Sequence, residues 1–492
     1  MKLRAFWGRM WFNGGGWGPH PDPAHFHFFV EDYQVFFFDT VLANLSSVDN
    51  TALFGAGWAP GDRPSLSTSP SQGNNSRAWP IPYEPPGTSG TSNLSSFVDG
   101  LWRGDFHGYL YGIDCWNSSE YPRTRFSTEF GLQSWPSLET MVAYAAVPPG
   151  VVANYSDPFW NARNHHPQGQ AQIAFFISQH YPTPRLSDTR AWLWLSQVAQ
   201  GYCIRQQAEH YRRLLSDSAP APTGGGSNMG ALYWQASDSW PAPTWSSLEY
   251  GGRRKVLHHL AARFFSPLLV SLFLEGDMAR GGVAVVNEDP FSARAGNVSV
   301  AVVSFLRGVV GALPVYPFSV PAAASARVGG FTLAQVAAAA RGGCGGVAAS
   351  GCFLVYEATG VAPPPPPPPH RTTRAGPDFL LLASVAPGSL ADPRLRVLGV
   401  DAAPGEPGRF LVRWAGDAPA LFVWFETPLR GAFSDNGFAF VPGVAPGPEA
   451  SLMWTAAPDA GAPPSAAELA ARLFVWSLFD VTAGVDLTKK RQ

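Results

Sequence analysis

The chain has 492 residues, of which 46% are hydrophobic and only 14% are charged, so it can bury sizeable cores in roughly two to four domains. Its formal net charge of −2, with no basic run outside the last few residues, argues against nucleic acid or an anionic membrane surface as a partner. No stretch of about 18 uncharged apolar residues occurs, so the sequence predicts no insertion into a membrane.

The N-terminal part gives few structural signals. Residues 1–30 hold no continuous apolar segment and break early into Gly and Pro, so we expect no signal peptide there. Residues 31–45 have an apolar face at helical spacing and predict a helix. Strand-like runs follow at "PSLSTSP" (64–70), "GDFHGYLYG" (104–112) and "RTRFSTEFG" (123–131), and later at "MGALYWQASD" (229–238).

Two helices are predicted beside the last two of these strands. Residues 188–217 keep apolar side chains at helical spacing, and residues 253–265 form a second helical pattern. Strands that alternate with helices favour a parallel sheet with crossover helices. Polar and aromatic residues gather just after the strand ends, where a (β/α) barrel carries its chemistry. We therefore expect a barrel-like catalytic domain over residues 31–267.

The pattern changes after about residue 267, where short alternating strands replace the helices. Residues 268–360 predict a β-sandwich, residues 361–375 a Pro-rich linker in a polyproline II conformation, and residues 376–492 a second sandwich. The alanine-rich tract "AQVAAAARGG" is interpreted as compositional bias, with no chemistry assigned to it.

Glu129, in "RFSTEFGLQSWPS", is the first candidate for a catalytic group. Retaining glycoside hydrolysis uses two carboxylates about 5–5.5 Å apart, one of which attacks the anomeric carbon. Such a nucleophile must stay ionised and must be aimed rigidly, as the end of a barrel strand would allow. From these residues alone, a solvated glutamate before a glycine turn remains the simpler interpretation.

Aromatic and histidine side chains near other strand ends are candidate sugar contacts. The chain has 18 tryptophans, many of them beside polar or turn residues, a setting that suits stacking on sugar faces as well as ordinary packing. His107, Tyr109 and Trp116 belong to one such stretch, Trp135 follows Glu129, and Trp234 ends a later strand. No histidine or cysteine spacing typical of a metal site and no phosphate-binding loop occurs, so we predict neither metal nor cofactor.

The cysteines and the glycosylation motifs point to a secretory or lysosomal route. Cys344 and Cys352 are spaced to close a small hairpin disulfide, while the pairing of Cys115 and Cys203 stays open. The pattern Asn-x-Ser/Thr occurs at six positions, Asn44, Asn74, Asn93, Asn117, Asn154 and Asn297.

Three of these stretches together resemble the β-mannosidases of glycoside hydrolase family 2: "RTRFSTEFGLQSWPSLET", "GDFHGYLYGIDCWN" and "MGALYWQASDSWPAPTWSSLEYGG". The resemblance runs from about Glu31 to the C-terminus. It implies a multidomain protein: the second half of a (β/α)8 TIM barrel over residues 31–267, followed by two immunoglobulin-like β-sandwich domains. It also implies that the full-length protein is lysosomal or secreted.

The resemblance also assigns an activity and site residues. It implies a retaining exo-glycosidase, without cofactor, that releases terminal β-D-mannose from β-mannosides and N-glycan-derived oligosaccharides. Glu129 takes the position of the nucleophile. The implied sugar-binding residues are Trp234, His107, Tyr109, Trp116 and Trp135.

One part of the family pattern is not expected in this chain. The resemblance places the general acid/base in an Asn-Glu pair after the fourth barrel strand, and the match begins downstream of that position. We therefore expect a C-terminal portion of such an enzyme with little or no activity alone, because general acid catalysis typically contributes about 10²–10⁴-fold.

Two other functions remain to be weighed, and the oligomeric state stays open. A non-catalytic glycan-binding or interaction protein is the alternative from another class. A β-galactosidase or β-glucuronidase is disfavoured by the motif around Glu129.

Overall fold

The computed structural model describes residues 106–148, 150–217, 227–345, 349–361, 377–444 and 449–487. The chain forms two compact units. Of the smaller one (Met1–His107, Thr124–Phe126 and Ala219–Gly225) few residues are described, and in it the Phe106 amide donates to the Phe126 carbonyl oxygen (2.8 Å). The larger unit (Gly108–Arg123, Ser127–Ser218 and Gly226–Gln492) carries the features discussed below, apart from Phe106 and His107 of β1.

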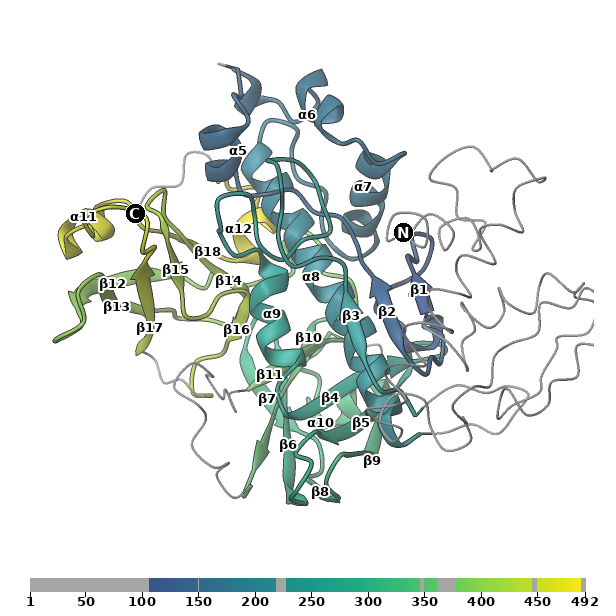
Figure 1. Cartoon of the computed structure of the whole chain (residues 1–492). Coiled ribbons are helices and arrows are strands. Elements are labelled where there is room, and N and C mark those ends of the chain that lie inside the picture. The colour runs from purple at the N-terminus through teal and green to yellow at the C-terminus, as the bar shows by residue number, and fades with distance from the viewer. Residues whose placement is uncertain are drawn as a thin grey trace, which may run out of the picture. The chain divides into compact units, whose positions relative to one another are not determined.

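A short parallel strand pair and a helical layer form the first part of the larger unit (Figure 1). Strand β2 (Ser127–Phe130) pairs in parallel with β3 (Ala231–Tyr233), and β1 (Phe106–Gly108) precedes them. The connection between β2 and β3 is helical, as a parallel pair requires. Its helices are α5 (Leu138–Tyr144), α6 (Pro158–Arg163), α7 (Gly169–His180) and α8 (Thr189–Arg213), with 3₁₀ turns at Val151–Ala153 and Leu214–Ser216. Another 3₁₀ turn, Ser118–Glu120, lies between β1 and β2, and α9 (Val256–Phe264) follows β3.

Helix α8 is the central element of this unit. Asp188 caps it by accepting a hydrogen bond from the Ala191 amide (3.0 Å), and almost every side chain from Thr189 to Arg212 is buried. A helix that is buried on all sides needs partners on all sides. In Figure 1 it runs behind β3 and α9, above β4, β5 and β10, and α5 and α7 flank it.

The first β-sandwich lies against this helical layer. One sheet has the order β4-β5-β9, and the other has the order β11-β10-β6-β7 with β8 also paired to β6. The pairs are antiparallel, and Leu272, Val283, Val300 and Leu354 belong to the core between the sheets. The strands are β4 (Leu268–Glu275), β5 (Arg280–Asn287), β6 (Arg294–Ser304), β7 (Gly308–Ala312), β8 (Tyr316–Val320), β9 (Ala324–Thr332), β10 (Cys352–Thr359) and β11 (Asp378–Leu381).

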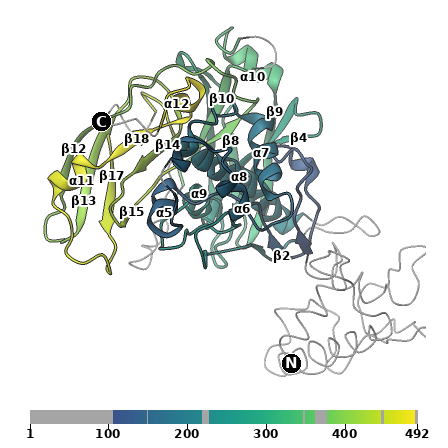
Figure 2. The ribbon, with the colours of Figure 1, turned by 90° about the horizontal axis from the view of Figure 1, so that it is seen from above.

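The second β-sandwich follows in the chain and lies to one side of the helices (Figure 2). Its sheets have the orders β12-β13-β17-β15 and β16-β14-β18, and Val412, Trp414, Phe425 and Trp454 pack between them. The strands are β12 (Arg396–Ala402), β13 (Arg409–Ala415), β14 (Ala420–Glu426), β15 (Gly431–Phe433), β16 (Phe438–Phe440), β17 (Glu449–Ala456) and β18 (Phe474–Trp476), with helices α11 (Ala466–Ala471) and α12 (Leu478–Thr482).

Most expected elements are present in the described part of the chain. The strands expected near His107, Glu129 and Trp234 and the helices expected at 188–217 and 253–265 are confirmed. The alanine-rich tract is a correction: its interpretation as bias was wrong, because α10 (Leu333–Ala339) forms there behind a capping box of Thr332 and Gln335. The helix expected at 31–45, the strand at 64–70 and the polyproline run fall outside the described residues.

Both cysteine pairs are joined in the structure. Cys344 bonds to Cys352 and Cys115 to Cys203, so the pairing that the sequence left open links the segment after β1 to α8. Of the glycosylation candidates, Asn154 and Asn297 are exposed. Asn117 is 9% exposed and its amide donates to the Gly276 carbonyl oxygen (2.9 Å), so it is the least suited to carry a glycan. Asn44, Asn74 and Asn93 fall outside the described residues.

Acid should destabilise the fold partly through His210 on α8. Its Nε2 atom donates to the Pro122 carbonyl oxygen (3.2 Å). Burial, with the positive charges of Arg213 and Arg123, lowers the pKa of His210 to about 3. The unfolded imidazole binds its proton near pH 6.5, so this contribution to stability is complete above that pH and is lost as pH falls toward 3.

The stability of a His210→Gln variant should therefore depend less on pH, while its amide still donates to Pro122. We expect the wild-type protein to lose about 2 kcal/mol more than the variant between pH 7 and pH 5, measured by chemical denaturation. His165→Gln, at an exposed histidine, is the control, and its unfolding free energy should change with pH as that of the wild type does. An equal change of the unfolding free energy with pH in wild type and His210→Gln would contradict this role of His210.

Candidate active site

Glu129 lies near the end of β2 and is held by a tyrosine from another segment. The Tyr109 hydroxyl donates to the Glu129 Oε1 atom at 2.9 Å. Burial, and then the charge of Glu129, raise the pKa of Tyr109 above its ordinary value. Tyr109 therefore stays protonated at neutral pH and remains a fixed donor to the carboxylate.

Aromatic rings from the segment after β3 lie beside this pair. The Trp234 amide donates to the Phe130 carbonyl oxygen (2.8 Å), and the Trp234 side chain is 42% exposed. The Trp245 ring meets Tyr109 edge-on, with centroids 6.0 Å apart, and its Nε1 atom donates to the Tyr111 hydroxyl (2.9 Å). The Trp234 backbone and the Trp245 ring therefore lie against Gly131, two residues after Glu129.

Helix α8 fixes the loop that follows Glu129 through a buried polar stripe. The Ser196 hydroxyl accepts from the Trp135 amide (2.9 Å), while the Gln200 side chain donates to the Leu132 carbonyl oxygen (2.7 Å) and accepts from the Ser134 hydroxyl (2.7 Å). Ser196 and Gln200 lie one helical turn apart, so they reach the loop from the same face of the helix. Buried polar groups with satisfied partners give this loop a single position.

Glu249 joins the same loop to the segment after β3. Its carboxylate is 2% exposed and accepts from the Ser137 amide and hydroxyl, both at 2.7 Å. It also accepts from the Thr140 hydroxyl and from the Gln197 amide (2.9 Å). The carboxylate thus aligns the start of α5 with the chain that carries Trp245.

Gly131 makes the close packing around Glu129 possible. A Cβ atom there would lie 2.6 Å from the Trp234 carbonyl oxygen and 2.9 Å from Trp245 Cδ1, inside contact distance. We expect Gly131→Ala to cost about 1–3 kcal/mol of stability through overpacking, with a lower thermal midpoint. Gly112→Ala is the matched control, because a Cβ there meets nothing within 4 Å. Equal midpoints for the two variants would contradict the tight packing.

The structure separates the expected sugar contacts into two groups. Tyr109 and Trp234 lie beside Glu129, as described above. The expectation that Trp116 and Trp135 contact the sugar needs correction. They are 2% and 0% exposed and pack in the core. Trp116 stacks on His180 (3.9 Å), and Trp135 Nε1 donates to the Tyr155 hydroxyl (3.0 Å). His107 lies in β1, and its side chain is outside what the structure describes.

Three residues at the site were not found from the sequence. Tyr111 and Trp245 are joined by the hydrogen bond described above, and the His166 ring lies against both, at centroid distances of 5.4 and 5.2 Å. A signal for Tyr111 was present, because residues i and i+2 of an extended segment share a face and Tyr109 precedes it by that spacing. His166 follows α6 in a loop and carried no such signal.

An Asn-Glu pair does occur in the chain, at Asn287–Glu288, at the end of β5 in the first sandwich. Glu288 forms an ion pair with Arg212 of α8 (2.8 Å). Because this pair follows a sandwich strand, it does not match the position after a barrel strand that the resemblance gives to the acid/base.

No metal or membrane function emerges from the described part of the chain. Among those residues, no group of three or more His, Cys, Asp and Glu side chains is arranged to hold a metal ion. None of the described helices combines the length and the hydropathy needed to cross a membrane.

Comparisons with known proteins match parts of the chain. A family model for an Ig-fold domain, Ig_mannosidase, matches residues 390–445, which include β12 to β16. The β-mannosidase of Capra hircus is 34% identical over 264 residues, which cover 52% of this chain and 26% of that protein. Beta-mannosidase A of Aspergillus clavatus is 28% identical over 385 residues, covering 72% of this chain and 38% of that protein.

Solved structures show a related fold. The β-D-mannosidase from Dictyoglomus thermophilum superposes with a TM-score of 0.59 at 20% identity, covering 77% of this chain and 41% of that one. The exo-chitosanase CsxA of Amycolatopsis orientalis gives a TM-score of 0.53 at 12% identity, covering 79% and 48%. The chain spans well under half the length of the curated relatives named above. Over the residues that match, the chain is similar to the β-mannosidases, and its partial coverage of them fits a C-terminal portion.

Proposed function

We propose that this chain forms the nucleophile-bearing part of a retaining exo-β-mannosidase that releases terminal β-D-mannose from β-mannosides and N-glycan-derived oligosaccharides. The observation that carries the proposal is the Glu129 carboxylate, held by the Tyr109 hydroxyl (2.9 Å) beside the exposed ring of Trp234. The similarity to β-mannosidases supports mannose as the sugar.

The proposed architecture is the second half of a (β/α)8 barrel over residues 31–267, followed by two immunoglobulin-like sandwiches at 268–360 and 376–492. The parallel pairing of β2 with β3 across a helical connection supports the barrel part. We place the full-length protein in the lysosome or outside the cell. Two disulfides and the exposed Asn154 and Asn297 motifs support that route.

The proposed mechanism assigns each residue a step. The Glu129 carboxylate attacks the anomeric carbon, the bond to the leaving oxygen breaks, and a covalent glycosyl-enzyme forms that water then hydrolyses. Tyr109 holds one oxygen of the carboxylate, so the nucleophile does not reorient during attack. Trp234 offers an apolar face for the sugar ring. We assign leaving-group protonation to none of the described residues, so we propose little or no activity for the chain alone.

The test is hydrolysis of an aryl β-mannoside, compared with an aryl β-galactoside and an aryl β-glucuronide. The assay uses both this chain and the longest natural product that contains it. Selective release from the mannoside by the longer product supports the proposal. Release from the galactoside or glucuronide at an equal rate contradicts it. Saturable binding of mannobiose with no hydrolysis by either protein favours the non-catalytic glycan-binding alternative.

A further inference from the structure

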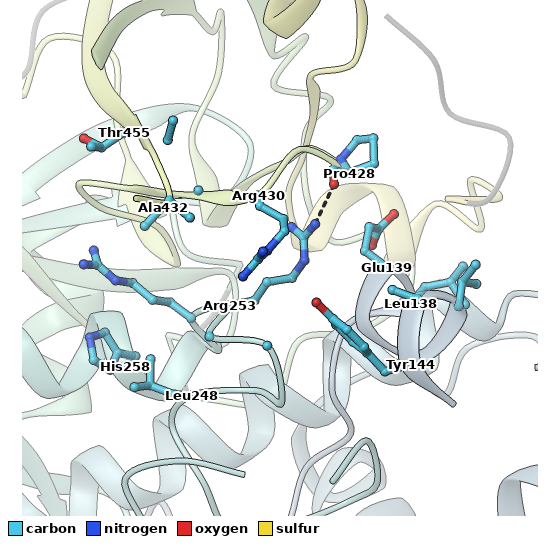
Figure 3. A pocket seen from close by; sticks show the side chains of 18 of the residues that line it. Leu138, Glu139, Tyr144, Leu248, Arg253, His258, Pro428, Arg430, Ala432 and Thr455 are labelled. Carbon is cyan, nitrogen blue, oxygen red and sulfur yellow. Dashed lines mark hydrogen bonds between the residues drawn. The ribbon is translucent and has the colours of Figure 1, made fainter. Parts of the chain in front are cut away.

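A cavity of about 880 Å³ lies at a place that the proposed catalytic site does not use (Figure 3). Its walls come from α5, from the segment 248–254 that follows Trp245, and from the second sandwich at Pro428, β15 and the end of β17, with Arg190 of α8 and His258 of α9. A volume of this size is typical of pockets that bind small molecules. All of its lining residues belong to the larger unit.

Two guanidinium groups in the lining have only carbonyl oxygens as partners. Arg253 donates to the carbonyl oxygens of Thr427 and Pro428, both at 2.8 Å, and Figure 3 shows the second of these bonds. Arg254 donates to the Phe433 carbonyl oxygen through one nitrogen (3.0 Å). Among the described residues, no carboxylate lies within 4.0 Å of either group. Neither guanidinium is therefore neutralised by a carboxylate in direct contact.

The other charged residues of the lining neutralise one another. Arg190 lies 2.8 Å from Glu139 and 3.3 Å from Glu426, and Arg430 lies 2.7 Å from Asp459. Burial, and then the charge of Glu139, raise the pKa of Glu426 well above its usual range, so that carboxyl keeps its proton and Arg190 balances Glu139 alone. The uncompensated charge of the cavity is therefore the pair Arg253 and Arg254.

An aromatic ring with a fixed position completes the cavity. Tyr144 is 42% exposed and meets Tyr250 edge-on, with centroids 5.2 Å apart. Its ring rests on Gly251, whose φ of +89° suits glycine and whose added Cβ would lie 2.7 Å from Tyr144 Cε2. The ring is thus oriented in advance, and its exposed part contributes an apolar surface beside Arg253 (Figure 3).

We propose that this cavity binds an acidic sugar, whose oxyanion is held by Arg253 and whose ring lies on Tyr144. Guanidinium groups bind carboxylate, sulfate and phosphate oxygens through charge-assisted hydrogen bonds, and an aromatic face suits the apolar side of a sugar ring. The site is separate from Glu129, so it binds whether or not the protein hydrolyses a mannoside.

Titration calorimetry on the full chain tests this site with four probes: glucuronate, glucose 6-sulfate, glucose 6-phosphate and neutral glucose. We expect saturable binding of one or more of the anionic sugars, weakened by added salt, and no saturable binding of glucose. The anionic sugar that binds most tightly identifies the oxyanion. Saturable binding of none of the three, or equal binding of glucose, would overturn the proposal. Inorganic sulfate binding as tightly as glucose 6-sulfate would overturn the role of the sugar ring.

Variants test the arginine and the tyrosine of the site separately. Arg253→Gln, which keeps a donor for one of the two carbonyl partners of Arg253, should weaken binding about tenfold, while Arg396→Gln on an exposed pair outside the cavity should leave it unchanged. Tyr144→Ala should also weaken binding, and Tyr144→Phe should retain it. Equal affinities of Arg253→Gln, Tyr144→Ala and wild type would overturn the assignment. Glu129→Gln should bind the acidic sugar as wild type does, so failure here and failure of the mannosidase proposal are distinguishable.

Discussion

Replacement of Glu129 by Gln is expected to lower kcat for aryl β-mannoside hydrolysis by at least about 10³-fold in the product that shows activity. The amide has nearly the shape of the carboxylate and can still accept from Tyr109 at the position where the acid does. It cannot form the covalent glycosyl-enzyme, because an amide oxygen is a poor nucleophile. KM should change far less than kcat, since the aromatic contacts remain. Steady-state kinetics measures both values.

A chemical rescue distinguishes a nucleophile from a residue that only maintains the fold. In Glu129→Ala, added azide or formate should take the place of the missing carboxylate and restore part of the rate, whereas the wild-type rate should not rise. Glu120→Gln, at an exposed glutamate of the 3₁₀ turn Ser118–Glu120, is the matched control and should keep full activity. Wild-type kcat in Glu129→Gln would refute the assignment of the nucleophile.

The sequence located the strand ends correctly because local signals define them. Glu129 and Trp234 each follow a short run of strand-forming residues bounded by turn residues, and the structure places β2 and β3 there as a parallel pair. The contact between Tyr109 and Glu129 was not predictable in this way. It joins residues 20 positions apart across a tertiary arrangement that no local pattern encodes.

Tryptophan burial was the feature that the sequence could not decide. Trp135 and Trp234 both stand beside polar residues, yet one is 0% and the other 42% exposed. The difference arises from α8, whose Ser196 binds the Trp135 amide and brings that ring into the core against Trp160 (5.3 Å). The place of Trp245 at the site was also not predictable from local sequence, because its hydrogen-bond partner Tyr111 lies 134 positions away in the chain.

Helix α8 thus carries two kinds of buried polar side chain along its length. Toward its N-terminal half, Ser196 and Gln200 fix the loop after Glu129. Further along, Arg205 and Glu209 connect the helix to the first sandwich. The sequence showed only the apolar spacing of this helix, because a glutamine or arginine at a buried position has the same local pattern as one on a solvated face.

Replacement of Arg205 by Met should therefore destabilise the protein by about 3–5 kcal/mol. Arg205 is 0% exposed, and its guanidinium donates to Glu209 (2.7 Å), Asp378 (2.9 Å) and the Tyr356 hydroxyl (2.5 Å). Methionine fills a similar volume but leaves the Glu209 carboxylate, also 0% exposed, without this cation. The urea midpoint of unfolding, followed by circular dichroism, measures the loss.

Two further variants test whether the loss comes from the unpaired buried charge. Arg396→Met removes an exposed pair with Asp417 and should cost at most about 1 kcal/mol. Arg205→Met combined with Glu209→Leu should recover much of the stability lost by Arg205→Met, because replacing a whole buried ion pair by apolar groups is often neutral. A double variant no more stable than Arg205→Met would show that the bonds from Arg205 to Asp378 and Tyr356, which fasten α8 to the first sandwich, carry most of the effect.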